Sequence, residues 1–349
     1  MTHPVRGTLV ALSSAAAIAC SAASDAVTPP TSGAMSPAAR TYLTSALDVM
    51  QTYSFYRNKI DWPAFRAAAL ANGEAAQAQT PAATYPAIRT ALAALGDHHS
   101  FLQPPVSASF ALSLHPSDSL DGEIVGGKYG YIRVPTYAPL NGGTTAQATA
   151  FADTLQALVR VTDAKGPCGW VVDLRHNSGG NMWPMLAGIG PIVGEGDNLG
   201  AFVDANGTIT RWYYTAGASG TTNGLTKQVS ASVDRTPYVL RSVNPPVAVL
   251  TDSRTASAGE AITVAFRGRS GARSFGAPTN GLPTANSAHP LSDGAVIWLM
   301  VALDMDRTGR QYVDPIPPDQ SAPTTAPPAT DDAAVSAAMA WLGAQTVCK

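Results

Sequence analysis

The chain has 349 residues, of which 45% are hydrophobic, so it is long enough to bury one large core or two smaller ones. Only 13% of the residues are charged, the formal net charge is −2, and no long run of lysine and arginine occurs. This charge pattern argues against nucleic acid as a partner. The 31 glycines and 27 prolines favour an α/β domain with many turns over a helical bundle.

Residues 1–20 have the pattern of an export signal. Arg6 provides a positive start, and an apolar stretch over residues 9–18 is too short to cross a bilayer. Small residues surround Cys20, which allows two interpretations: lipid attachment to Cys20 after cleavage, or ordinary cleavage at a nearby alanine. Both predict an exported protein, either periplasmic or tethered to the outer membrane. Residues 21–37 are rich in Pro, Ser and Thr and are expected to form a linker.

A small helical subdomain is predicted over residues 38–103. Apolar residues recur there at helical spacing, with Asp61 before Pro63 and Thr84 before Pro86 as helix starts and Gly96 as a helix end. The subdomain is too small to be expected to fold stably by itself, so its apolar faces are expected to pack on the larger domain.

Residues 104–349 are predicted to form an α/β core. The segments 129–135 and 168–175 have strand patterns and flank a helical pattern over residues 146–161, which makes a βαβ unit. Further strands are predicted at 199–203, 209–214, 246–250 and 295–305, and an amphipathic helix at 333–342. Residues 215–245 are rich in Gly, Ser and Thr, and their sequence favours no particular secondary structure.

Ser257 is the candidate nucleophile. It lies between the strand at 246–250 and a helical pattern over residues 258–266, where the free N–H groups and the positive end of the helix dipole can hold an oxyanion. Ala256, Ala258 and Gly259 flank it, so a substrate backbone could approach closely. The alternative is that Ser257 only caps the helix.

Two adjacent histidines, His98 and His99, supply the best candidate for a general base, on a loop that follows a helix. A polar surface loop is the alternative. Gly179 and Gly180 lie between a strand and a helical pattern, where their N–H groups could turn into a cavity as oxyanion donors. A simple tight turn is the alternative, and the missing Lys-Ser/Thr end argues against a nucleotide loop.

Beyond the export signal the sequence has two cysteines, Cys168 and Cys348. In an oxidising compartment they could form one disulfide between the C-terminal tail and the body; two unpaired thiols are the alternative. No cysteine and histidine spacing suggests zinc, so neither a metal nor another cofactor is expected.

Five motifs occur in an order similar to that of the C-terminal-processing (tail-specific) serine peptidases: DHHSF, VVDLRHNSGGNMWP, VLTDSRTASAGEA, FGAPTNG and DRTGRQYVDPIPPD. The resemblance covers about residues 38–345. It implies a crotonase/ClpP-like α/β fold, the tail-specific protease core, and it extends to the tricorn core protease and the interphotoreceptor retinoid-binding protein repeats.

The resemblance also implies roles for individual residues. Ser257 matches the nucleophile, and Leu282 stands where one branch of the family has a catalytic lysine, so a Ser-Lys dyad is not expected. His99 matches the histidine base of the tricorn-like branch. Asp314 follows the position of that branch's acid by one residue, so it could orient the base directly or through His98. The matching oxyanion donors are the N–H of Gly179 or Gly180 and that of Ala258.

The expected activity is peptide hydrolysis through an acyl-enzyme. Tail-specific members usually carry a PDZ module, for which there is no room between Ser100 and Tyr129, so short extracytoplasmic peptides are the expected substrates. The main alternative is a ligand-binding protein on the same scaffold, and an esterase using the same serine is a third. In a binding protein, four residues could line an apolar pocket instead of packing in the core: Trp170, Met182, Trp183 and Trp298.

Overall fold

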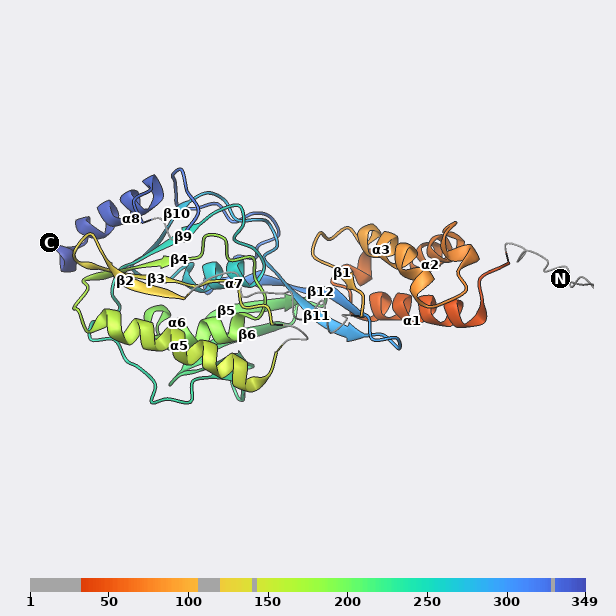
Figure 1. Ribbon diagram of the computed structural model, residues 1–349, viewed down its shortest axis with the longest axis horizontal. Helices are drawn as coiled ribbons and strands as arrows, with labels where there is room; N and C mark the ends of the chain where they lie inside the picture. Colours follow the sequence, from red (N-terminus) through yellow and green to blue (C-terminus); the bar gives the residue numbers. More distant parts are fainter. Residues whose placement is uncertain (1–32, 106–119, 140–142, 328–329) are drawn as a thin grey trace, which may run out of the picture.

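The computed structural model describes residues 33–105, 120–139, 143–327 and 330–349 (Figure 1). The predicted export signal and Cys20 lie outside the described residues, as does most of the predicted linker. Within the described ranges, no helix combines the length and the apolar character needed to cross a membrane.

The N-terminal region is helical, as predicted. Helices α1 (Pro37–Tyr53) and α2 (Trp62–Ala71) begin at Ser36 and Asp61, whose side chains accept hydrogen bonds from helix N–H groups. Helix α3 (Tyr85–Ala94) follows, and short 3₁₀ turns cover Arg57–Lys59, Ala75–Gln77 and Ala82–Thr84. The apolar faces of these helices share one buried cluster with Ala295, Ile297 and Leu299. Two of those three residues lie in strand β12 (Val296–Met305). The core of the helical region is therefore completed by a strand about 200 residues later in the sequence.

Strand β12 also organises the larger, seven-stranded sheet. The start of β12 pairs with β1 beside the helices, its end pairs with β5 in the core, and β11 pairs along most of its length (Figure 1). The sheet is antiparallel throughout, in the order β1-β12-β5-β6-β7-β8, with β11 on β12. Its other strands are β1 (Phe101–Gln103), β5 (Gly196–Asp204), β6 (Ile209–Thr215), β7 (Ala218–Thr222), β8 (Lys227–Ser232) and β11 (Thr284–Pro290).

The second sheet has the strand order β13-β10-β9-β4-β3-β2, and only the β2–β3 pair is antiparallel. Its two central strands are buried along their whole length, as expected for parallel strands covered on both faces. The strands are β2 (Asp121–Val125), β3 (Tyr129–Arg133), β4 (Gly169–Asp173), β9 (Val247–Thr251), β10 (Ala272–Gly276) and β13 (Gln320–Ser321).

The helices of the core cover both faces of the second sheet. On one face, α5 (Thr145–Asp163), α6 (Met182–Val193) and α7 (Ala258–Phe266) share the main buried cluster with residues of both sheets. On the other face packs α8 (Ala333–Ala344). The predicted α/β core preceded by a helical region is therefore confirmed. Because β4 and β9 are parallel neighbours, the loops after them, which carry the glycine pair and Ser257, meet at one edge of the sheet.

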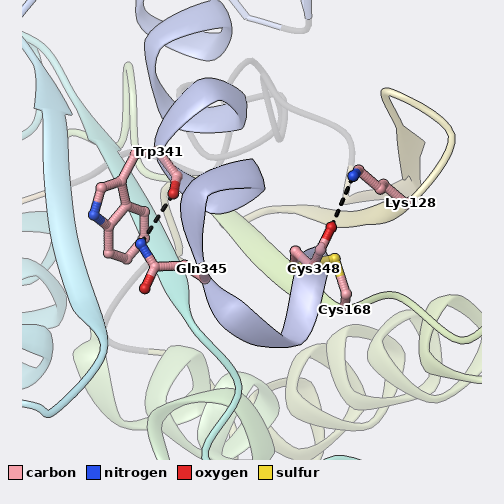
Figure 2. The surroundings of a disulfide bond; sticks show 5 residues. All are labelled: Lys128, Cys168, Trp341, Gln345 and Cys348. Carbon is pink, nitrogen blue, oxygen red and sulfur yellow. Dashed lines mark hydrogen bonds between the residues drawn. A yellow bond between two sulfur atoms is a disulfide. The ribbon is translucent and has the colours of Figure 1, made fainter.

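The C-terminal end is tied to the body of the core. Cys348, in the 3₁₀ turn Thr346–Cys348, forms a disulfide with Cys168, just before β4, with Cα atoms 5.1 Å apart (Figure 2). The Lys128 ammonium donates a hydrogen bond of 2.9 Å to the Cys348 carbonyl oxygen. The tail thus holds α8 against the outer face of the sheet.

Candidate active site

Ser257 immediately precedes α7 in a strained conformation, with φ 51° and ψ −116°. A positive φ is unusual for a residue with a side chain and is kept only where the surroundings enforce it. The Ser257 N–H donates to the Glu260 carboxylate at 2.9 Å, and the Ser257 carbonyl accepts from Ala261 at 2.9 Å. The preceding Ala256 N–H donates to the Asn177 carbonyl at 2.9 Å. These bonds fix the serine between the loop after β4 and the start of α7.

Glu260 is the main organiser of this turn, a role that the sequence did not reveal. Its side chain is fully buried and accepts four hydrogen bonds: from the N–H groups of Ser257, Gly281 and Leu282, and from the Thr279 hydroxyl. Burial raises the pKa of Glu260, and the four hydrogen bonds oppose that rise. The only available signal was a glutamate three residues after a possible helix cap, the capping-box spacing.

The two glycines after β4 have different roles. The Gly179 N–H donates to the Asn177 side-chain oxygen at 3.0 Å, so it is already engaged. The N–H groups of Gly180 and Ala258 have no acceptor within the part of the chain that the structure describes, and both residues line one cavity. The geometry therefore favours Gly180 over Gly179 as the partner of Ala258 in an oxyanion hole.

Both glycine positions also exclude a side chain. A Cβ atom on Gly179 would lie 2.8 Å from the Ser257 Cβ, and one on Gly180 would lie 2.1 Å from the Tyr137 carbonyl oxygen. Their φ angles, 106° and 103°, lie in the region that favours glycine. The close approach of Gly179 to Ser257 brings the glycine loop and the nucleophile turn together.

His99 lines the same cavity as Ser257. Its Nδ1 lies 2.6 Å from the Thr284 hydroxyl oxygen, at the start of β11. With the proton on Nδ1, the ring donates to Thr284, and Nε2 is left to accept a proton. The His99 N–H donates to the Asp97 carboxylate at 3.0 Å, and its carbonyl accepts from the Asn286 amide at 2.8 Å. Burial lowers the pKa of His99 to about 4, against the opposing charge of Asp97, so the imidazole is neutral at pH 7.

The cavity measures about 890 Å³ and lies where α6, α7, β5 and β12 meet the DHHS loop. His98 is exposed and lines it. Asp314 is also exposed but is not among the lining residues, and the side-chain partner that the structure gives His99 is Thr284 instead. Three of the four residues considered for an apolar pocket line this cavity: Met182, Trp183 and Trp298. The fourth, Trp170, is fully buried in the main core.

Among the described residues, no cluster of three His, Cys, Asp or Glu side chains could hold a metal ion. The groups that the cavity offers are a serine on a strained turn, a neutral imidazole and two backbone N–H groups that have no acceptor among the described residues. These are the kinds of group that acyl transfer uses. Ser257 and His99 share the cavity, but no hydrogen bond joins their side chains among the described residues.

Residues 128–322, more than half of the chain, match the model of peptidase family S41. The nisin-resistance protein of Lactococcus lactis subsp. lactis is 25% identical over 81% of this chain and 83% of its own length. A carboxyl-terminal-processing protease of Synechocystis sp. is 29% identical over 55% of this chain, which spans only 37% of that longer protein.

Two solved structures share the fold. A lipoprotein from Streptococcus agalactiae superposes with a TM-score of 0.69 at 22% identity, over 88% of this chain and 97% of its own. The photosystem II D1 C-terminal processing protease superposes with a TM-score of 0.56 at 15% identity, over 82% and 94% of the two chains. Together with the family match, they confirm the resemblance drawn from the five motifs: the chain belongs to peptidase family S41, a family of serine-type peptidases.

Proposed function

We propose that the protein hydrolyses peptide bonds, with Ser257 as the nucleophile and His99 as the general base. The observation that carries this proposal is that Ser257, His99, Gly180 and Ala258 all line one cavity in a chain of a peptidase family. Each has the property that its role requires: a strained serine at a helix start, a neutral imidazole, and two N–H groups without an acceptor among the described residues.

The reaction follows from these properties. His99 Nε2 takes the hydroxyl proton as Ser257 Oγ bonds to the peptide carbonyl carbon, and the N–H groups of Gly180 and Ala258 hold the negative oxygen. The C–N bond then breaks, and the amine leaves with the proton from His99. Water, deprotonated by the same imidazole, then attacks the acyl carbon. The bond to Ser257 Oγ breaks, the acid is released, and His99 returns the proton to Ser257.

Thr284 is a positioning residue in this proposal. The Thr284 hydroxyl lies 2.6 Å from His99 Nδ1. In the proposed mechanism it accepts from the protonated Nδ1, so that Nε2 is free, and it stabilises the imidazolium that forms during attack. Asp314 was expected to orient the histidine base. Because Thr284 contacts the His99 ring instead, Asp314 has no role in the proposed mechanism. His98, exposed on the lining, is placed to contact substrate.

Short peptides outside the cytoplasm are the proposed substrates. The same proposal includes export of the protein, followed by either lipid attachment at Cys20 or ordinary signal cleavage. A cavity of about 890 Å³ can hold several residues of an extended peptide. The relative from Lactococcus is named for resistance to nisin, which makes nisin one specific peptide to test.

The test is a mass-spectrometric survey of a peptide pool, with nisin assayed beside it. Purified mature protein is compared with Ser257→Ala and His99→Ala, and with Ser253→Ala, an exposed serine on the same loop, as the matched control. Cleavage that the first two changes abolish and the control retains supports the proposal. Cleavage that persists in Ser257→Ala would refute it.

A ligand-binding protein is the second candidate, because aromatic side chains line the cavity beside the polar groups. Phe101 and Trp298 stack there with ring centroids 6.2 Å apart. If no peptide is cleaved, and apolar ligands bind equally to wild type and Ser257→Ala, this reading replaces the peptidase.

A further inference from the structure

Asp304, near the end of β12, is a buried carboxyl group that has no hydrogen-bond partner in the part of the chain that the structure describes. It is 1% exposed, and neither of its carboxyl oxygens has a hydrogen-bond partner among the described residues. It nevertheless lines the cavity that contains Ser257. It is also the only carboxylic acid on the described lining, which contains no lysine or arginine. Buried polar groups are rarely left unpaired, so this one requires an explanation.

The backbone holds Asp304 firmly in place. Its N–H donates to the Pro283 carbonyl and its carbonyl accepts from the Tyr312 N–H, both at 3.0 Å. In the antiparallel pairing, Asp304 lies opposite Phe202 of β5, so the two side chains share one face of the sheet. Trp183 packs edge-on against Phe202, with ring centroids 6.1 Å apart, and both aromatic residues line the cavity.

An unpaired carboxyl group in such a place is costly to the folded protein. Desolvation disfavours its charged form, and the nearby Glu260 adds like-charge repulsion; both raise the pKa of Asp304. A cation that enters the cavity removes this cost, because it supplies the missing charge and hydrogen bonds. Lysine and arginine side chains also carry apolar stems that can pack on aromatic rings, and cations are attracted to ring faces.

We infer that Asp304 is a specificity residue that binds the lysine or arginine side chain of a peptide residue adjacent to the scissile bond. The inference rests on the proposed peptidase function. The two sites are linked through α7: Ala258 supplies an oxyanion donor, and Ala261, one turn further, lines the same cavity with a small side chain. The oxyanion donor, a small residue one turn further along α7 and Asp304 therefore line one continuous space.

The experiment uses N-acetylated, C-amidated peptides, so that no terminal charge competes. Each cleaved sequence is resynthesised with lysine or with norleucine at every position flanking the cut. Wild type is compared with Asp304→Asn, which keeps the side-chain shape, and with Asp331→Asn, the same change at an exposed site. We expect lysine to be preferred over norleucine at one position by roughly 30-fold or more in kcat/KM. Asp304→Asn should remove that preference, and Asp331→Asn should retain it.

A binding measurement separates this inference from the proposed function. Nα-acetyl-lysine amide and Nα-acetyl-norleucine amide are titrated against Ser257→Ala protein by NMR, with and without Asp304→Asn. Tighter binding of the lysine probe that disappears with Asp304→Asn supports the inference even if no peptide is cleaved. Equal binding of the two probes overturns it. Ser257-dependent cleavage without any preference for lysine or arginine also overturns it, while leaving the peptidase proposal standing.

Discussion

The pH dependence of peptide cleavage is the sharpest consequence of the way His99 is buried. A general base works only while it is unprotonated, and burial lowers the pKa of His99 from 6.5 to about 4. At pH 5, about 90% of the imidazole is then neutral, whereas a histidine with an ordinary pKa would be about 3% neutral. We therefore expect kcat/KM at pH 5 to remain close to its neutral-pH value, about 30-fold above the value for an ordinary histidine.

The assay is the profile of kcat/KM between pH 3.5 and pH 8 with an uncharged peptide, and near-ultraviolet circular dichroism at each pH to confirm folding. Asp304→Asn is measured in parallel, because that carboxyl group titrates in the same cavity. An acidic limb centred near 6.5 in both proteins would refute the reasoning. The same shift should appear in stability, because the folded state resists protonation of His99: about 3 kcal/mol is present above pH 6.5 and is lost as the pH falls through about 4.

Four other changes have expected outcomes. Thr284→Val should lower kcat about tenfold or more by removing the acceptor for the His99 ring, and Thr284→Ser should restore it in the same kinetic assay. Gly180→Ala places a Cβ atom 2.1 Å from a backbone carbonyl oxygen, so kcat should fall about 100- to 1000-fold; an unchanged kcat would argue against the oxyanion role. Asp304→Leu should raise the denaturation midpoint by the equivalent of about 1–3 kcal/mol; a lower midpoint would contradict the burial of an unpaired carboxyl group. The stability advantage of Leu should grow as the pH rises above about 4, because the Asp304 carboxyl group ionises there in the unfolded chain but not in the folded protein, where its pKa is raised. Replacing Cys168 and Cys348 by serine opens a loop of 180 residues and should cost about 5 kcal/mol in the chain-entropy model, which thermal denaturation with and without reductant would check.

Elements with a strong local pattern could be predicted from the sequence. The continuous apolar runs of β4 and β9 and the helical spacing in α5 and α7 are properties of short segments that favour one conformation wherever they pack. The position of Ser257 at the start of α7 followed from the same reasoning. Strand β8 was missed, because most of its residues are exposed and it is held by pairing with β7 rather than by any apolar alternation.

The partners of the predicted site residues could not be found in this way, because they are distant in sequence. Thr284 is 185 residues from His99 and lies in a segment, GLPT, that resembles an ordinary turn. Asp304 stands at the end of an apolar strand, where a charge usually marks the strand's exit into solvent. Asp314 looked better placed because a family pattern has an acid nearby, yet the chain carries it to an exposed position outside the cavity. An acid close to a family motif in sequence was therefore a weaker guide to the partner of His99 than the contact between the histidine loop and the segment that contains Thr284.

The segment that follows FGAPTN has no lysine but contacts both halves of the candidate site. Leu282 stands at the lysine position of the other branch, and its N–H binds Glu260, which also holds the N–H of Ser257. Two residues later, Thr284 binds His99, so the same stretch of backbone joins the nucleophile turn to the histidine loop. In the lysine branch this segment would deliver the base itself; in the mechanism proposed for this chain, it delivers only Thr284, which orients a base that comes from the histidine loop.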